Sequence, residues 1–256
     1  MPESDVALLE RIVRKAGAIA QAIYDKPHKT WSKKDGSPVT EADLAVNRFL
    51  NEELRSARPD YGWLSEESED DPARLAARRV FVVDPIDGTL AFVKHRPHFT
   101  ISAAVVEDGM PVAGAVHNPI TVQTFAAAKG GGAMLNGNTI RVSARRELEG
   151  CRMLASKATL SNRRWRPWPA MHVEVPNSIA YRVSLVASGS FDVAITMAET
   201  HDWDLAAADL ILREAGGIIT SLNGEALHYN RAAVAQPSVL AAGPALHAVV
   251  LSRLRR

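Results

Sequence analysis

The N-terminal part of the chain carries the apolar period of two amphipathic helices separated by a polar segment. Apolar side chains recur every three or four residues over about residues 6–24, which predicts a helix with one buried face, and Asp5 suits its N-terminal cap. Residues 26–38 are polar and contain glycine and proline, so they predict a loop. A second helix is expected from Thr40, because Asp43 stands three residues later, close to the spacing of a capping box.

The remainder of the chain changes to short apolar runs and then to an alternation of strand and helix patterns. Val-Phe-Val-Val at 80–83 stops at Asp84-Pro85, which predicts a buried strand that ends in a loop. Further strands are expected over 99–106, 112–117, 122–128, 193–196, 218–221 and 239–242. Further helices are expected over 178–188, 205–214 and 245–254. This order predicts stacked layers of helix and sheet, a mixed α+β or α/β fold.

Length and charge bound the kinds of protein that this chain can be. With 256 residues it has room for one large domain or two intimate halves, which we place at 1–145 and 146–256. A net charge of +1 gives no reason to expect nucleic acid or a membrane surface as a partner. The single cysteine, Cys151, cannot form an internal disulfide or a thiolate metal cluster.

The chain also lacks the apolar segments that mark membrane and secreted proteins. No apolar run reaches the roughly 20 residues of a membrane-spanning helix. The N-terminus has neither the basic start nor the apolar core of a signal peptide. A cytoplasmic location is therefore the expectation.

Acidic residues stand at the ends of several predicted elements. They are Asp43, Glu66, Glu67, Asp84, Asp87 and Asp204. Carboxylate oxygens are hard ligands that suit Mg²⁺, whereas histidine and cysteine are not clustered with them, which argues against zinc. The acidic residues therefore make a magnesium site the leading hypothesis.

The run Asp-Pro-Ile-Asp-Gly-Thr at 84–89 concentrates this chemistry. The bend stiffened by its proline can aim Asp84, the Ile86 carbonyl and Asp87 at one point, and Gly88 lets the backbone approach a phosphate. A helix that begins after Thr89 would favour an anion at its N-terminus. Metal ligands and a phosphate cradle would then share one segment, the layout of two-metal phosphoryl transfer. Asp-Pro and Asp-Gly pairs are also common in solvated turns, but the whole run after a buried strand is far more specific.

Several short motifs resemble those of the inositol monophosphatase superfamily of magnesium-dependent, lithium-sensitive phosphatases. They lie at 37–43 (Ser-Pro-Val-Thr-Glu-Ala-Asp), 64–68 (Leu-Ser-Glu-Glu-Ser), 83–89, 203–207 (Trp-Asp-Leu-Ala-Ala) and 214–217 (Glu-Ala-Gly-Gly). The resemblance extends over nearly the whole chain. It implies a layered α-β-α-β-α sandwich, a homodimer, and two or three Mg²⁺ ions per active site.

The resemblance also assigns roles to individual residues. The metal ligands that it implies are Glu66, Asp84, the Ile86 carbonyl, Asp87 and Asp204. It gives Glu66 and Thr89 the orientation of the attacking water, with Asp43 holding the Thr89 hydroxyl. The backbone N–H groups of Gly88 and Thr89 would hold the phosphate, and Asp204 would face the substrate. Either Lys33 or Lys34 would line a loop near a third, weaker metal site.

The motifs leave the substrate open. Inositol phosphatases usually have Thr-Asn-Phe where this chain has Leu-Ala-Phe at 90–92, and Met197 stands where they place a glutamate, although Glu199 is close by. Arg182 stands where 3'(2'),5'-bisphosphate nucleotidases place a lysine, so it could clamp a second phosphate or be a surface or ion-paired arginine. Arg-Pro-His at 96–98 resembles the general pattern of histidinol-phosphate phosphatases.

The leading prediction is therefore a magnesium-dependent phosphatase of a small metabolite, most similar to inositol monophosphatase. Bisphosphate nucleotidase and histidinol-phosphate phosphatase are the alternatives within the superfamily. A catalytically idle binding protein is the alternative of a different class. The sequence disfavours it, because an idle relative is expected to lose a ligand and all of them are present.

Overall fold

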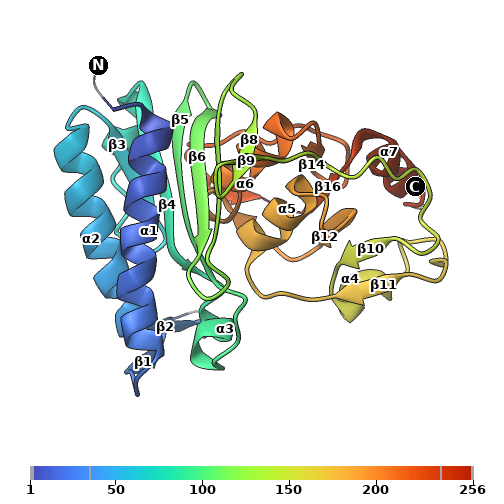
Figure 1. Cartoon of the computed structure of the whole chain (residues 1–256), viewed down its shortest axis with the longest axis horizontal. Helices are drawn as coiled ribbons and strands as arrows, with labels where there is room; N and C mark the ends of the chain where they lie inside the picture. Colours follow the sequence, from blue (N-terminus) through green and yellow to red (C-terminus); the bar gives the residue numbers. More distant parts are fainter. Residues whose placement is uncertain (1–2, 35, 237, 255–256) are drawn as a thin grey trace.

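The computed structural model describes residues 3–34, 36–236 and 238–254. Layers of helix and sheet alternate along its long axis (Figure 1). Helices α1 (Asp5–Tyr24) and α2 (Glu41–Ala57) cover one face of the larger sheet, and α5 (Ile179–Ala187) and α6 (Asp202–Glu214) lie between the two sheets. Helix α7 (Pro244–Leu251) closes the far side. The predicted α-β-α-β-α sandwich is confirmed.

The two sheets are built from consecutive parts of the chain. The larger is seven-stranded, in the order β3 (Gly62–Ser65), β4 (Arg79–Asp87), β5 (Thr100–Glu107), β6 (Met110–Asn118), β7 (Gln123–Ala128), β8 (Ala133–Leu135) and β9 (Asn138–Thr139). The smaller is five-stranded, in the order β11 (His172–Glu174), β10 (Arg152–Leu154), β12 (Val193–Thr196), β16 (Val239–Ala242) and β14 (Ile218–Thr220). The predicted division into 1–145 and 146–256 falls between β9 and β10 and stays a prediction.

Short elements connect these layers. Two-stranded ribbons pair β1 (Thr30–Ser32) with β2 (Pro38–Thr40), and β13 (Thr200–His201) with β15 (Ala235–Gln236). The short helices are α3 (Thr89–Val93), α4 (Lys157–Leu160) and the 3-10 turn η1 (Pro72–Ala76). Among the described residues, no helix has both the length and the apolar character needed to cross a membrane.

The apolar runs predicted as strands are explained by burial on both faces of each sheet. In β4, Val80 and Val82 pack in the core around α5 and α6, whereas Phe81 and Val83 pack against α1 and α2. Side chains alternate between the faces of a strand, so a strand covered on both sides must be apolar at every position. The smaller sheet behaves alike, since Ala241 of β16 joins the central core and its neighbours join the core under α7.

Several predicted boundaries were wrong. Strand β4 does not stop before Asp84; it continues to Asp87, and its register with β5 shifts between Asp84 and Asp87. Helix α6 begins at Asp202, so Asp204 lies in its first turn. The α1 cap is Ser4, whose hydroxyl accepts the Ala7 N–H group at 3.4 Å. The capping box of Thr40 and Asp43 at the start of α2 is confirmed.

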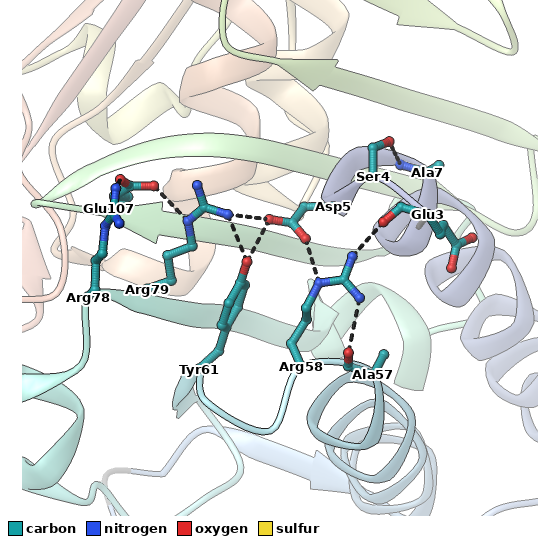
Figure 2. Close-up of polar contacts among 10 residues, drawn as sticks. All are labelled: Glu3, Ser4, Asp5, Ala7, Ala57, Arg58, Tyr61, Arg78, Arg79 and Glu107. Atoms are coloured by element: carbon teal, nitrogen blue, oxygen red, sulfur yellow. Dashed lines mark hydrogen bonds and ion pairs between the residues drawn. The ribbon is translucent and has the colours of Figure 1, made fainter. Parts of the chain in front are cut away.

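Asp5, expected to cap α1, instead fastens that helix to its neighbours (Figure 2). Its carboxylate accepts hydrogen bonds from Arg58 Nε at 3.0 Å, from the Tyr61 hydroxyl at 3.0 Å and from Arg79 Nη1 at 3.2 Å. Arg79 also donates to Glu107 at 2.6 Å. This network lies where β4 begins, and Figure 1 shows α3, which follows the Asp87 end, at the opposite end of that strand. Charge pairing here holds the outer helix layer on the sheet that carries the site.

A candidate metal and phosphate site

Three carboxylates meet where β4 ends. Asp84 and Asp87 lie in the irregular last residues of that strand, and Asp204 lies in the first turn of α6. One ligand oxygen of each lies within 4.8 Å of those of the other two. The shift of register at the end of β4 is what turns Asp84 and Asp87 toward the same point, as a bulge re-aims side chains. The sequence predicted this meeting of a strand end and a helix start.

Asp84 and Asp204 are each held through one oxygen, whereas both oxygens of Asp87 accept hydrogen bonds from the start of α5. Asp84 Oδ1 accepts the Ile86 N–H group at 3.0 Å, and Asp204 Oδ2 accepts the His201 N–H group at 2.7 Å. Asp84 Oδ2 is buried and has no hydrogen-bond partner among the described residues. Buried polar atoms are almost always satisfied, so this oxygen points to a missing cation or donor.

The electrostatics of the cluster lead to the same conclusion. Burial raises the pKa of Asp84, and the charges of Glu66, Asp87 and Asp204 raise it further. Burial and the Asp87 charge raise the pKa of Asp204. Burial raises the pKa of Asp87 to about 6, although hydrogen bonds from Ser178 and the backbone oppose the rise. Crowded buried carboxylates need either protons or a cation, and an all-oxygen set suits Mg²⁺.

Glu66 lies beside the cluster and is paired with a lysine. Strand β3 runs parallel to β4 with Ser65 opposite Val83, and this register brings the following Glu66 next to Asp84. Its Oε1 accepts from Lys33 Nζ at 2.7 Å, and the same ammonium group contacts Glu67. Glu66 is not one of the three residues whose ligand atoms meet. The structure therefore places Lys33 at the site, and the adjacent Lys34 is exposed.

The Thr89 hydroxyl lies between two acceptors. Its Oγ1 is 3.1 Å from Asp43 Oδ1 and 3.1 Å from the Ile86 carbonyl, and its single proton can go to either. Asp43 Oδ2 accepts the Thr40 N–H group at 2.8 Å and the Thr40 hydroxyl at 2.6 Å. Burial raises the pKa of Asp43, and the bonds from Thr40 and Thr89 oppose the rise. Asp43 is thus a fixed acceptor within reach of the Thr89 hydroxyl.

Gly88 has the backbone conformation that the motif requires. Its φ of +96° lies in the left-handed region, and a Cβ there would come within 2.9 Å of the His98 carbonyl and 3.0 Å of the Ser178 nitrogen. The backbone conformation and these close backbone contacts together make any side chain at this position strained. Helix α3 begins at Thr89, next to the carboxylates, and its first N–H groups have no acceptor within the helix.

Arg182 is held by backbone carbonyls rather than by a carboxylate. On α5 it is mostly buried, and its Nε donates to the Pro176 carbonyl at 2.6 Å, with Nη2 at 3.5 Å from the Asn177 carbonyl. Burial lowers its pKa, and the Asp87 charge opposes this. Within the described residues no carboxylate forms an ion pair with it, so the ion-paired alternative is wrong. Its proposed contact with a second phosphate stays a prediction.

One contact at the site was not anticipated from the sequence. The Ser178 hydroxyl donates to Asp87 Oδ2 at 2.6 Å. A serine just before a helical pattern is a cap signal, and Ser178 does cap α5. Its contact with Asp87 joins residues that are distant along the chain, so no local pattern could have indicated it.

Known proteins similar to this chain come from one family of phosphatases and their relatives. A model of the inositol monophosphatase family matches residues 2–256. A 3'(2'),5'-bisphosphate nucleotidase CysQ from Aggregatibacter actinomycetemcomitans is 32% identical over 247 residues, 90% of each chain. An inositol-1-monophosphatase from Rhizobium meliloti is 36% identical over 195 residues, 73% of each chain. The crystal structure of extragenic suppressor protein suhB from Bartonella henselae superposes with a TM-score of 0.84 at 27% identity, covering 97% of both chains.

Two sheets between helical layers, with a buried acidic cluster beside a helix start, define a layered α/β protein with three carboxylates that could hold a metal ion. The chain belongs to the inositol monophosphatase family. Its relatives support a phosphatase of that superfamily, acting on a small phosphorylated molecule, and the family generally uses Mg²⁺.

Proposed function

We propose that this chain is a magnesium-dependent phosphomonoesterase of a small phosphorylated metabolite, with an inositol 1-phosphate-type substrate as the leading candidate. The observation that carries the proposal is the buried cluster of Asp84, Asp87 and Asp204. Two features of the cluster support a cation at this site. Asp84 Oδ2 has no hydrogen-bond partner among the described residues, and the pKa values of all three carboxylates are raised.

In this proposal the metal ligands are Glu66, Asp84, the Ile86 carbonyl, Asp87 and Asp204. Bound Mg²⁺ would neutralise phosphate charge, acidify a coordinated water and stabilise the leaving oxygen. Lys33 lies 2.7 Å from Glu66 Oε1, so a metal ion at Glu66 would share this carboxylate with the lysine. Two or three ions per site are expected, as in the family.

The chain's own groups supply the rest of the chemistry. Asp43 accepts from the Thr89 hydroxyl, which lets the Thr89 oxygen accept in turn from the attacking water, with Glu66 as its partner in orienting that water. The N–H groups of Gly88, the N-cap residue, and of Thr89, the first residue of α3, would donate to the phosphate oxygens. No covalent protein nucleophile is required.

A second candidate substrate is a 3'(2'),5'-bisphosphate nucleotide. Arg182 favours it, because a buried guanidinium without a carboxylate partner can hold a second phosphate. A relative named bisphosphate nucleotidase, at 32% identity, supports the same possibility. Against it, Arg182 already uses donors on the Pro176 and Asn177 carbonyls. Histidinol phosphate is the third candidate, with support only from the sequence pattern.

The direct test measures phosphate release from inositol 1-phosphate, 3'-phosphoadenosine 5'-phosphate, histidinol phosphate and fructose 1,6-bisphosphate. Each is assayed with Mg²⁺ and after exhaustive chelation. We expect turnover of one of these only with Mg²⁺, and inhibition by lithium as in the family. Full activity after chelation would exclude the proposed metal chemistry. A folded, Mg²⁺-binding protein that turns over none of them would favour the idle binding protein. A homodimer in the cytoplasm, without nucleic acid, remains the expected setting.

A further inference from the structure

The hydroxyl of Ser178 has a completely determined set of partners. The side chain is fully buried. Its Oγ donates to Asp87 Oδ2 at 2.6 Å, accepts the Tyr181 N–H group at 2.9 Å, and lies 2.9 Å from Thr100 Oγ1. An ionised carboxylate cannot donate, so the only proton of Ser178 goes to Asp87. Thr100 must then be the donor to Ser178, which sets the direction of both hydroxyl groups.

This arrangement makes the two oxygens of Asp87 unequal. Oδ2 accepts two short bonds, from the Ser178 hydroxyl and the Ala180 N–H group, both at 2.6 Å. Oδ1 accepts only the Ile179 N–H group, at a longer 3.2 Å. Oδ2 therefore has both lone pairs in use, and Oδ1 is the oxygen left with capacity for a cation.

We propose that Ser178 is a positioning residue that sets the orientation of the Asp87 carboxylate, so that Oδ1 serves the metal centre and Oδ2 holds helix α5. This inference rests on the proposed function. Removing a residue that hydrogen-bonds a metal ligand typically weakens metal binding by about 10- to 100-fold, because the ligand is then no longer held in the orientation that binds the metal.

The same contacts join the metal centre to the helix that carries Arg182. Asp87 accepts the N–H groups of Ile179 and Ala180 in the first turn of α5, where a negative charge also complements the helix dipole. Because Ser178 belongs to both the cap and the carboxylate, displacement of the helix start would rotate Asp87. The metal centre and the start of α5 thus act as one unit.

The test is calorimetric titration of MgCl₂ into the parent protein, Ser178→Ala and Ser178→Gly. Glycine is tolerated at helix caps, so the second variant removes the hydroxyl with less effect on α5. Ser184→Ala is the matched control, because Ser184 is a fully buried serine of the same helix whose hydroxyl has no partner among the described residues. We expect Mg²⁺ affinity about tenfold weaker in both Ser178 variants and unchanged in the control.

Kinetics distinguish a positioning role from general loss of structure. The Mg²⁺ concentration for half-maximal activity should rise about tenfold in Ser178→Ala, whereas kcat at saturating Mg²⁺ should recover most of the parent value. A proportional loss of kcat with the half-maximal Mg²⁺ concentration unchanged would overturn the inference. So would Mg²⁺ affinity within twofold of the parent in the folded Ser178 variants.

Folding failure and failure of the proposed function remain separable. If both Ser178 variants melt below the assay temperature, Thr100→Val removes only the donor to Ser178, and it should still weaken Mg²⁺ binding by a few-fold. Parent-like affinity in that variant would overturn the inference. If the parent protein binds Mg²⁺ and hydrolyses substrate, and the Ser178 variants do so equally well, the role of Ser178 is rejected while the proposed function stands. A parent protein that binds no Mg²⁺ rejects the proposed function, and this inference with it.

Discussion

Lys33 Nζ lies 2.7 Å from Glu66 Oε1, so the ammonium group of the loop between β1 and β2 already holds a carboxylate that the proposed metal centre needs. The same ammonium contacts Glu67. Lys33 therefore acts as a built-in counter-ion for the acidic site, and its positive charge would oppose a divalent cation there.

Replacing Lys33 by methionine should strengthen Mg²⁺ binding in the absence of substrate. The pair is only partly buried, with 23% and 26% of the two side chains exposed, so we expect a gain of about two- to fivefold. Calorimetric titration measures it. Lys34→Met is the control, because that neighbouring lysine is exposed. Equal affinities in the two variants would show that Lys33 does not compete with the ion.

Asp204→Asn should lose activity by about 100-fold or more yet melt at a higher temperature in chelator. It removes a ligand, but it also removes one of the like charges that burial has brought together, and its amide could donate to Asp84 Oδ2. Phosphate release and thermal melting measure the two effects. A melting temperature that falls in chelator would contradict this account of the cluster.

Asp209, further along the same helix, provides the matched comparison for Asp204. It is fully buried but paired, since it accepts from Arg213 and from the Tyr229 hydroxyl at 2.7 Å. Asp209→Asn should therefore destabilise the protein by about 1–3 kcal/mol. Its Mg²⁺ affinity should stay at the parent value.

Without metal, the carboxylate cluster should make the protein less stable as pH rises from about 5 to 7. Asp87 has a pKa of about 6 in the folded protein and an ordinary value when unfolded, so between the two the folded state binds more protons. Stability falls with rising pH wherever that holds. His117, whose pKa burial lowers to about 4, acts in the opposite direction.

The contribution of the cluster is isolated by comparing the parent with Asp84→Asn in chelator. His117 is common to both proteins and cancels in the difference. The stability advantage of Asp84→Asn should grow between pH 5 and pH 7, and saturating Mg²⁺ should abolish it. Melting curves at each pH measure it, and an advantage independent of pH would show that the carboxylates do not repel one another as described.

Arg182→Ala should separate the two leading substrate classes. If Arg182 holds a second phosphate, kcat/KM for a bisphosphate should fall by about 10- to 100-fold, since a charge-assisted contact is worth roughly 1.5–3 kcal/mol. A substrate with only the scissile phosphate should change little. Arg182→Gln is the control, because glutamine can still donate to the Pro176 carbonyl but carries no charge. Equal losses on both substrates in Arg182→Ala, restored by glutamine, would assign Arg182 to loop anchoring instead.

The sequence by itself determined the elements and the local devices. The apolar period of α1, the run at 80–83 and the capping box of Thr40 and Asp43 are interactions between residues a few positions apart, so they are visible along the chain. The motif at 84–89 likewise predicted that acidic ligands and a helix start would adjoin, which the structure bears out in its geometry.

Only the tertiary structure decided which side chains meet. It chose Lys33 over Lys34 for Glu66, turned Arg182 onto backbone carbonyls, and joined Ser178 to Asp87 across 91 positions of sequence. Strand β4 also runs on past Asp84 because β5 offers it pairing partners that no local pattern reveals. Such contacts depend on how separate helices and strands pack against one another. A sequence pattern shows only which residues within one helix or strand are apolar or polar.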